Sequence, residues 1–516
     1  MRGSSTPAAS GGSFLGRAGP LVLARLFTAG LTLSIPLVLA RVLTLDDYGT
    51  YYQLFLIATT LYYVLPFGVV QSLYYFLPRA EAKRPFLGQT LLFMSGAGLV
   101  GGAAVWALLG PVADAFSNPA LAGYRLPLAA YTAFLLGSFP LEVSLTSQGR
   151  TRASAGVYLV SDAVRASVMV VPPLLGASLY GMMTAVAAFA ALRYVATWLV
   201  SLRGATGPLV DGQRFREQLA YAAPFGAAML LAIPQQNAHL YAVAGAVAPA
   251  LYALYRVGCF QLPVVDLLYT PTSEVLMVRL GELEREGRLE EGVESFREAA
   301  GKLAYFFLPF AAFLFSAAPE FIGAMFGEKF LPAVPVFRVS VLGVVLSILP
   351  MDGTLRARGQ TRAIFASYAV KAAVTVPLVW VGVKHFGLMG GIGSWAVAEV
   401  VGKAMLLARV PAALSTPKRK LGMVDVIPWQ VLGKAALAAC AASAGVFLLR
   451  AAAHGAWAHL PTGFLWRALP LASAGALFFI GYLGVLHFAG VRPLSAITGL
   501  RARRAGRVLP PLRGGT

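Results

Sequence analysis

The sequence predicts an all-α integral membrane protein, and three observations lead to that fold class. Hydrophobic residues make up 58% of the 516 residues, charged residues make up only 12%, and long apolar runs recur along most of the chain. A water-soluble protein of this length would be about one quarter charged and would divide into several domains. The composition therefore excludes an ordinary soluble enzyme, a disordered chain and a fibrous repeat.

The apolar runs are long enough to be counted as membrane-spanning helices. A helix needs about 20 mostly apolar residues to cross a bilayer. By this measure the sequence predicts fourteen spans, with short loops and no large soluble insertion. The predicted spans are residues 20–43, 51–76, 87–112, 125–148, 153–175, 178–202, 216–241, 247–277, 302–326, 331–354, 362–383, 388–410, 428–450 and 464–489.

Two polar segments lie outside the spans. Residues 1–19 are rich in Gly, Ser and Ala, and we expect them to be disordered in the cytoplasm. The apolar run that follows continues past Ala40 without a small-residue cleavage site, which argues against a cleaved signal peptide. Residues 278–300 alternate Glu with Arg at helical spacing and keep a partial apolar side. This pattern predicts a cytoplasmic helix that lies on the membrane surface.

The excess of positive charge indicates how the chain is oriented. The sequence has 42 Lys and Arg residues against 22 Asp and Glu residues, a net charge of +20. With a cytoplasmic N-terminus, the predicted spans place most of these cations in cytoplasmic segments, as the positive-inside rule requires. The sequence therefore predicts that both termini are cytoplasmic, and nucleic acid is not needed to explain the charge.

The chain contains an internal repeat. Residues 140–153 read PLEVSLTSQGRTRA and residues 350–363 read PMDGTLRARGQTRA, so that Glu142 is matched by Asp352. Both copies run from the end of one span to the start of the next in the same direction, which makes the repeat parallel. It predicts two six-helix lobes around a central cavity, then two further helices and a basic cytoplasmic tail. These parts are residues 20–202, 203–410, 411–490 and 491–516.

Several charged residues fall inside the predicted spans. An ionised side chain at the bilayer centre costs at least about 2.5–3.5 kcal/mol, so these residues must face the protein interior or a wet cavity. Arg193, Lys403 and Lys434 lie near the inner ends, where we expect them to reach the interface. The other basic residues are Arg25, Arg165, Arg256, Arg338 and Lys371, and the acids are Glu142, Asp162, Asp266, Glu274, Glu320, Asp352 and Glu399.

The basic residues point to an anionic ligand. Arg25, Arg256 and Lys371 have no acid three or four residues away on their own helix, so we expect them to be unpaired charges that face a cavity. Arg165 is a further candidate for substrate binding, although Asp162 is close enough on the same helix to neutralise it. Arginine suits a diphosphate especially, because its planar guanidinium donates two hydrogen bonds to phosphate oxygens.

The acidic residues are the candidates for coupling or gating. Glu142 and Asp352 lie near the cytoplasmic ends of their spans beside loop arginines. They form either a repeated ionic closure or two structural locks, and the sequence does not decide between these roles. Asp162, Asp266 and Glu399 are the further acidic candidates within spans.

No catalytic or metal-binding motif accompanies these charges. The patterns G-x-x-x-x-G-K-[ST], H-E-x-x-H and G-x-S-x-G are absent, and the five His residues show no metal-ligand spacing. We therefore expect a transporter rather than an enzyme, with no catalytic residue, no metal, no cofactor and no nucleic-acid partner.

Four segments resemble the bacterial polysaccharide-unit flippases. Residues 40–79 contain RVLTLDDYG, which is similar to that family's first loop, R-x-L-[ST]-x-[DE]-[DE]-[YF]-G. Residues 250–277 resemble its eighth helix, and residues 314–339 resemble its pattern P-x-x-[IL]-x-x-[LM]-F-G. Residues 385–399 are similar to its F-G-x-x-G stretch. The resemblance covers about residues 20–410.

The resemblance implies the multidrug/oligosaccharidyl-lipid/polysaccharide exporter fold. In the related lipid II flippases, arginines on helices 1 and 8 meet the lipid diphosphate, and the matching positions here are Arg25 and Arg256. Some relatives hold a coupling cation on helices 7, 11 and 12. Here helix 7 offers Asn237 beside two glutamines and helix 11 carries Lys371, which argues against a sodium site. Lys371 then serves as a tethered positive charge or as a substrate ligand.

These inferences lead to one hypothesis with two alternatives. We expect the chain to move an undecaprenyl-diphosphate-linked oligosaccharide across the bacterial cytoplasmic (inner) membrane by alternating access, for O-antigen, capsule or exopolysaccharide export. Membrane lipids and a polysaccharide polymerase are the other expected partners. The nearest alternative is a multidrug/cation antiporter of the same fold, which usually has twelve helices and an acidic cavity. A membrane glycosyltransferase or polymerase is the alternative of another class, but the outer loops are short for that chemistry.

Overall fold

The protein is helical throughout the part of the chain that the structure describes. The computed structural model describes residues 14–260, 263–458 and 464–491, without the side chains of 14–26, 231, 234, 264, 453–458 and 464–467. It is 85% helical, and β pairing in the described residues is limited to one bridge between Thr416 and Arg419. These observations confirm the predicted all-α membrane fold. Residues 14–19 of the predicted disordered segment are helical and begin α1, so the prediction is wrong there; residues 1–13 and all but the first residue of the basic tail lie outside the described residues.

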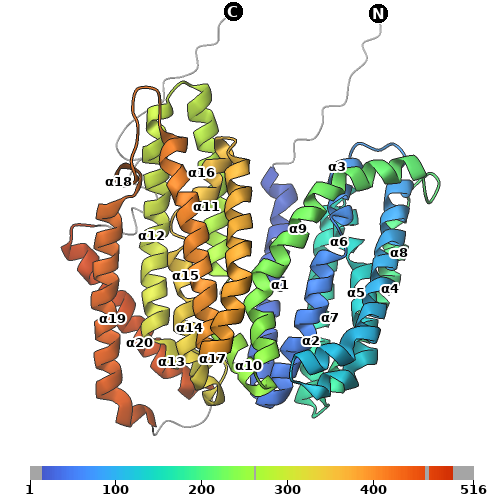
Figure 1. Ribbon diagram of the computed structural model, residues 1–516, viewed down its shortest axis with the longest axis horizontal. Helices are drawn as coiled ribbons and strands as arrows, with labels where there is room; N and C mark the ends of the chain where they lie inside the picture. Colours follow the sequence, from blue (N-terminus) through green and yellow to red (C-terminus); the bar gives the residue numbers. More distant parts are fainter. Residues whose placement is uncertain (1–13, 261–262, 459–463, 492–516) are drawn as a thin grey trace, which may run out of the picture. The chain divides into compact units, whose positions relative to one another are not determined.

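Contacts divide the chain into two compact units, Met1–Arg256 and Val257–Thr516. The helices of the first unit (Figure 1) are α1 (Phe14–Val42), α2 (Leu45–Val64), α3 (Val69–Phe76), α4 (Arg84–Ala115), η1 (Pro119–Tyr124), α5 (Arg125–Ser138), α6 (Pro140–Ser147), α7 (Thr151–Leu174), α8 (Leu179–Ser201), α9 (Gly212–Ala246) and α10 (Pro249–Gly258), the last as far as Arg256. Because α9 packs on α2, α3 and α4, this division falls later than the predicted lobe boundary at residues 202 and 203. The two predicted lobes and the two added helices stay predictions.

The second unit is also built of helices alone in its described part. They are α11 (Val264–Arg285), η2 (Leu289–Glu291), α12 (Gly292–Ser316), α13 (Ala318–Met325), η3 (Glu328–Ala333), α14 (Val334–Ser340), α15 (Leu342–Val345), α16 (Met351–Ala357), α17 (Thr361–Leu414), α18 (Met423–Val426), α19 (Trp429–Ala458) and α20 (Phe464–Phe488). The last two, α19 and α20, pack on each other, and α19 also packs on α12.

Eight helical segments in the described residues are long and apolar enough to cross a membrane. A ninth forms if α2 and α3, which are bent by 42° at the break between them, are counted as one span. The protein is therefore a multi-pass membrane protein. The predicted count of fourteen spans is not confirmed and stays a prediction.

The break between α2 and α3 follows from three consecutive residues. Pro66 has no backbone N–H to continue the helix, and Phe67 and Gly68 adopt left-handed backbone angles, with φ of 46° and 76°.

Elsewhere in this unit, α4 packs closely on α5 because Gly98 has no side chain. A Cβ at Gly98 would lie 2.4 Å from the carbonyl oxygen of Ala133.

The 54-residue α17 is a helical hairpin rather than one straight helix. Gly387, with φ 55° and ψ −133°, breaks the helical backbone at the loop predicted between spans 362–383 and 388–410. The two arms then pack tightly, since a Cβ at Gly390 would overlap the backbone of Gly382. The hydroxyl of Ser394 donates to the carbonyl of Leu378 across the arms at 2.9 Å.

The two copies of the sequence repeat form the same turn. In the first copy, the N–H of Gly149 donates to Thr146 and the N–H of Arg150 donates to Leu145. In the second copy, the equivalent bonds are Gly359 to Arg356 and Gln360 to Leu355. Both glycines have positive φ, 78° and 65°, which is the left-handed conformation that ends a helix. The repeat in the sequence is therefore a repeat in local structure.

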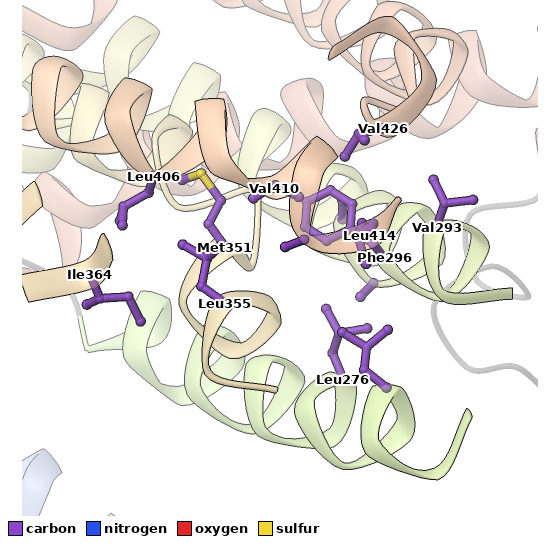
Figure 2. Close-up of a cluster of buried hydrophobic side chains, with 14 residues drawn as sticks. Leu276, Val293, Phe296, Met351, Leu355, Ile364, Leu406, Val410, Leu414 and Val426 are labelled. Carbon is purple, nitrogen blue, oxygen red and sulfur yellow. The ribbon is translucent and has the colours of Figure 1, made fainter. Parts of the chain in front are cut away.

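Residues 278–300 do not form the single helix that the sequence predicted. The stretch spans the end of α11, a turn at Gly287 with φ 71°, η2 and the start of α12. Its apolar residues do not lie on a membrane surface, because they belong to the buried core of the second unit (Figure 2). Leu280 and Phe296 are fully buried there, packed with Met351 and Leu414 among others. The partial apolar side of the stretch marks this helix–helix packing.

Candidate functional site

Arg256 lies at the end of the first unit against a cluster of tyrosines on α2. Its guanidinium carbon is 4.5 Å from the centre of the Tyr52 ring, a cation–π contact. Tyr52 packs edge-on against Tyr48, with ring centres 5.0 Å apart, and Tyr51 packs beside both. The predicted substrate cation Arg256 is thus held by aromatic rings.

Arg165 lies on α7 and joins that helix to α1. It pairs with Asp162 at 3.0 Å and also donates to the hydroxyl of Thr32 on α1 at 2.8 Å. The pairing with Asp162, which the sequence left open, is therefore present, and a second donor group of Arg165 reaches α1.

Arg25 lies on α1, seven residues before Thr32, and α1 packs on α7. The side chain of Arg25 is outside the described residues, so its predicted contact with substrate stays a prediction.

The coupling candidate Asn237 is half-buried on α9, two residues after the buried Gln235. His239, one turn after Gln235 on α9, is buried, and its Nδ1 lies 2.7 Å from the hydroxyl of Tyr255.

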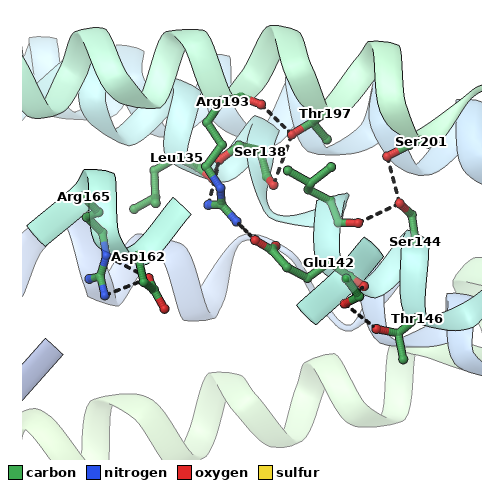
Figure 3. A network of polar contacts seen from close by, with 12 residues as sticks. Leu135, Ser138, Glu142, Ser144, Thr146, Asp162, Arg165, Arg193, Thr197 and Ser201 are labelled. Carbon is green, nitrogen blue, oxygen red and sulfur yellow. Dashed lines mark hydrogen bonds and ion pairs between the residues drawn. The ribbon is translucent and has the colours of Figure 1, made fainter. Parts of the chain in front are cut away.

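Glu142 forms a buried ion pair with Arg193, which joins α6 to α8 (Figure 3). Their side chains are only 7% and 18% exposed, and Arg193 also donates to the hydroxyl of Ser138 at 3.3 Å. The ion pair that Glu142 forms is therefore not with the loop arginines Arg150 and Arg152, as expected of an ionic closure. It lies instead between two helices of the first unit.

Asp352, the repeat counterpart of Glu142, is bound differently. Its Oδ2 accepts a hydrogen bond of 2.9 Å from the hydroxyl of Tyr269 on α11, and its buried Oδ1 has no hydrogen-bond partner in the described structure. The ammonium of Lys403 lies 5.5 Å from the centre of the Tyr269 ring. In the second copy, therefore, a tyrosine contacts both the acid and a nearby base, whereas in the first copy the acid and the base are in direct contact.

Lys371 is not the unpaired charge that the sequence suggested. Its ammonium forms an ion pair with Glu399 on the opposite arm of α17, and the two side chains are 11% and 20% exposed. The search for an acid on the same stretch of helix missed this partner because the hairpin at Gly387 brings distant residues together. Lys371 and Glu399, predicted in separate roles, are one pair.

Asp266 stands apart from these groups. It is exposed in the first turn of α11 and forms no ion pair among the described residues. No group of three or more His, Cys, Asp or Glu within the described part of the chain is arranged to hold a metal ion.

Sequence reasoning missed one strong pair and undervalued another residue. Arg450, the last residue of the predicted span 428–450, lies on α19 and binds both carboxylate oxygens of Glu320 at 2.6 Å, as well as the carbonyl of Ser316. Arg193 was expected to reach the interface but is buried in its ion pair.

The fold is shared with solved membrane transporters of low sequence identity. The lipid II flippase MurJ, in an inward closed conformation, aligns with 91% of this chain and 99% of its own at 12% identity and a TM-score of 0.70. A multidrug resistance MATE family transporter of the MOP superfamily, in an inward-facing conformation, covers 78% and 99% at 14% identity and a TM-score of 0.54. A MOP superfamily transporter from Pyrococcus furiosus covers 80% and 100% at 12% identity and a TM-score of 0.50. These likenesses establish the MOP-superfamily transporter fold.

A family model narrows this class. The model described as polysaccharide biosynthesis protein matches residues 38–335, which is more than half of the chain. The chain therefore belongs to this family, as the resemblance in the first loop and in residues 314–339 indicated. A search of curated proteins found no match to the sequence. The fold is one that solved transporters and a solved flippase share.

Proposed function

We propose that this chain is a flippase for undecaprenyl-diphosphate-linked oligosaccharide units. It moves them by alternating access across the bacterial cytoplasmic membrane for surface polysaccharide export. Support comes from the family match over residues 38–335 and from the shared fold of the lipid II flippase. In this proposal both termini are cytoplasmic, and the nearest protein partner is a polysaccharide polymerase.

The observation that carries the proposal is the contact of Arg256 with the tyrosine cluster of α2, where its guanidinium lies 4.5 Å from the centre of the Tyr52 ring. Arg165, on α7 of the same unit, supplies a second guanidinium. Guanidinium groups bind phosphate oxygens through paired hydrogen bonds, and tyrosine rings stack on the apolar faces of sugars. A basic and aromatic wall of this kind suits a diphosphate attached to a sugar better than it suits a cationic drug.

Further residues take defined roles in the proposal. Arg25 adds a third cation from α1, the helix on which Arg165 already reaches Thr32. The pair of Lys371 and Glu399 supplies a switchable charge, because separation of the two groups would free one positive charge for the substrate. Glu142, Asp352, Asp162, Asp266 and Asn237 remain candidates for coupling or gating.

Complementation of a strain that needs the exported polysaccharide tests the proposal. Arg256→Ala and Arg165→Ala should abolish most surface polymer, while Arg256→Lys should retain part of it because the charge remains. Arg203→Ala is the matched control, since Arg203 is an exposed arginine of the same unit. Full surface polymer from Arg256→Ala and Arg165→Ala, at normal amounts of protein in the membrane, would overturn the assignment.

The multidrug antiporter remains the second candidate, because a multidrug MATE transporter shares the fold. The two functions differ in the charge that they require of the ligand. An antiporter predicts that the Arg256→Ala variant keeps resistance to cationic dyes and that the unmodified chain confers it. A flippase predicts no such resistance from either chain.

A further inference from the structure

A pocket in the second unit lies where the two ends of the α17 hairpin meet. Its volume is about 670 Å³, within the range of roughly 300–1,000 Å³ that is typical of small-molecule sites. One wall is the repeat turn and the first helical residues after it, and the other is the last turn of α17. The lining residues are Gly359, Gln360, Thr361, Arg362, Ala363, Ala366, Arg409 and Ala412.

Two arginines give this pocket its chemistry. Arg362 and Arg409 come from opposite arms of α17, and within the described residues neither forms an ion pair. Their neighbour Arg358 differs, because its guanidinium is bound to Glu284 at 2.7 Å. Two guanidinium groups that share one hollow repel each other unless an anion lies between them, and phosphate fits their paired donors.

Small side chains leave room beside the two charges. Ala363, Ala366 and Ala412 line the pocket, so no large side chain fills the space between Arg362 and Arg409. One turn beyond Ala366 on the same face of the helix, Val370 is 40% exposed. Exposed apolar side chains follow the pocket along this face of α17, since Val381, three turns beyond Val370, is 57% exposed, and they form an apolar strip.

The position in the membrane indicates which phosphate the pocket meets. Thr361–Leu414 is apolar enough to span a membrane, and Arg362 and Arg409 lie at its two ends. Because the hairpin brings these ends together, both arginines lie at the same level, where headgroups meet water. An anion at that level with an apolar strip beside it has the form of a lipid.

We propose that this pocket binds the phosphate of an anionic phospholipid, with one acyl chain along Val370. A free phosphate has the same headgroup chemistry, but it gains nothing from the apolar strip. The site uses none of the residues assigned above to the transported substrate, so it goes beyond the proposed flippase activity. Lipid bound there would hold the two arms of the hairpin together beside the ion pair of Lys371 and Glu399.

Native mass spectrometry of the full chain in detergent, titrated with phosphatidylglycerol or phosphatidylcholine, tests the proposal. The unmodified chain should bind phosphatidylglycerol about tenfold or more tightly, and Arg362→Gln with Arg409→Gln should remove that preference. The double variant Lys418→Gln with Lys420→Gln loses the same charge from exposed positions outside the pocket and should keep the preference. Ala366→Leu, which fills the pocket and leaves both arginines, should also remove it.

Three outcomes would overturn the proposal. The first is an unchanged lipid preference in both the arginine double variant and Ala366→Leu. The second is an equal loss in the lysine double variant, which would mean that net charge alone attracts the lipid. The third is displacement of phosphatidylglycerol by an equal concentration of inorganic phosphate, which would assign the pocket to a free anion.

Discussion

Glu142 and Arg193 form an ion pair between α6 and α8 with only 7% and 18% of their side chains exposed, and the sequence repeat matches Glu142 to Asp352 in the second unit. There Asp352 accepts a hydrogen bond from Tyr269, and the Tyr269 ring faces Lys403. The repeated acid is therefore held by a direct ion pair in the first unit and by a tyrosine in the second. Glu142 is already paired with a cation, whereas one carboxylate oxygen of Asp352 has no hydrogen-bond partner in the described structure. The two acids therefore differ in how readily they can bind a proton or a cation.

Removal of one member of the first-unit pair should destabilise the protein strongly. Glu142→Gln leaves Arg193 buried without a counter-charge, which costs about 3–5 kcal/mol in typical buried pairs. The midpoint of thermal unfolding in detergent should therefore fall. The double variant Glu142→Gln with Arg193→Met removes both charges and should recover most of the loss. Equal midpoints for the single and double variants would show that the pair does not contribute as described.

The pair of Lys371 and Glu399 should respond to a reversal of its charges. Lys371→Glu alone places two acids face to face. It should lower the midpoint of thermal unfolding and reduce polymer export about tenfold or more. The exchange Lys371→Glu with Glu399→Lys keeps one charge of each sign and should restore stability. If export returns with stability, the pair acts on conformation; if only stability returns, the position of the cation itself matters. A stable single variant would contradict the ion pair.

The repeated turn predicts a specific cost at two glycines. Gly149→Ala and Gly359→Ala each force a side chain into the left-handed region, at about 1–2 kcal/mol, although open space surrounds both positions. Gly96→Ala on α4 is the control, because Gly96 also has open space but a helical backbone. It should stabilise by about 0.5–1 kcal/mol. Unfolding midpoints that fall for all three variants alike would contradict the backbone argument.

The bond between Arg450 and Glu320 should require the shape of arginine and not only its charge. Arg450→Lys keeps the cation but cannot donate to both carboxylate oxygens and to Ser316 at once. We expect α19 to become more sensitive to limited proteolysis in this variant, with Lys420→Arg as a control outside the contact. Wild-type protection in Arg450→Lys would show that charge alone holds α19 to α13.

The sequence predicted what depends on local patterns. The apolar runs predicted a helical membrane fold, and the PLEVSLTSQGRTRA repeat predicted two copies of one element that now share their turn. Both rest on interactions between neighbours in the chain, which a sequence displays directly. The positive φ values at Gly149 and Gly359 agree with their place in the repeat.

The pairing of charges was less accessible from the sequence. Lys371 had no acid within one helical turn, yet the bend at Gly387 brings Glu399 against it. In the same way, the charged stretch at residues 278–300 looked like a surface helix, because its apolar side gave no sign that a hairpin would bury Leu280 and Phe296. Such contacts depend on where chain reversals place distant residues. The contact of Arg256 with the Tyr52 ring also required the fold.

Transbilayer movement of an undecaprenyl-diphosphate oligosaccharide in proteoliposomes tests the central claim most directly. The purified full chain should speed the exposure of a fluorescent lipid-linked sugar to an external quencher. Arg256→Ala should slow that exposure about tenfold or more, while Arg203→Ala should keep the rate. Arg256, unlike Arg203, contacts the tyrosine cluster. Movement at the wild-type rate by well-reconstituted Arg256→Ala, or no acceleration by the unmodified chain, would contradict the account.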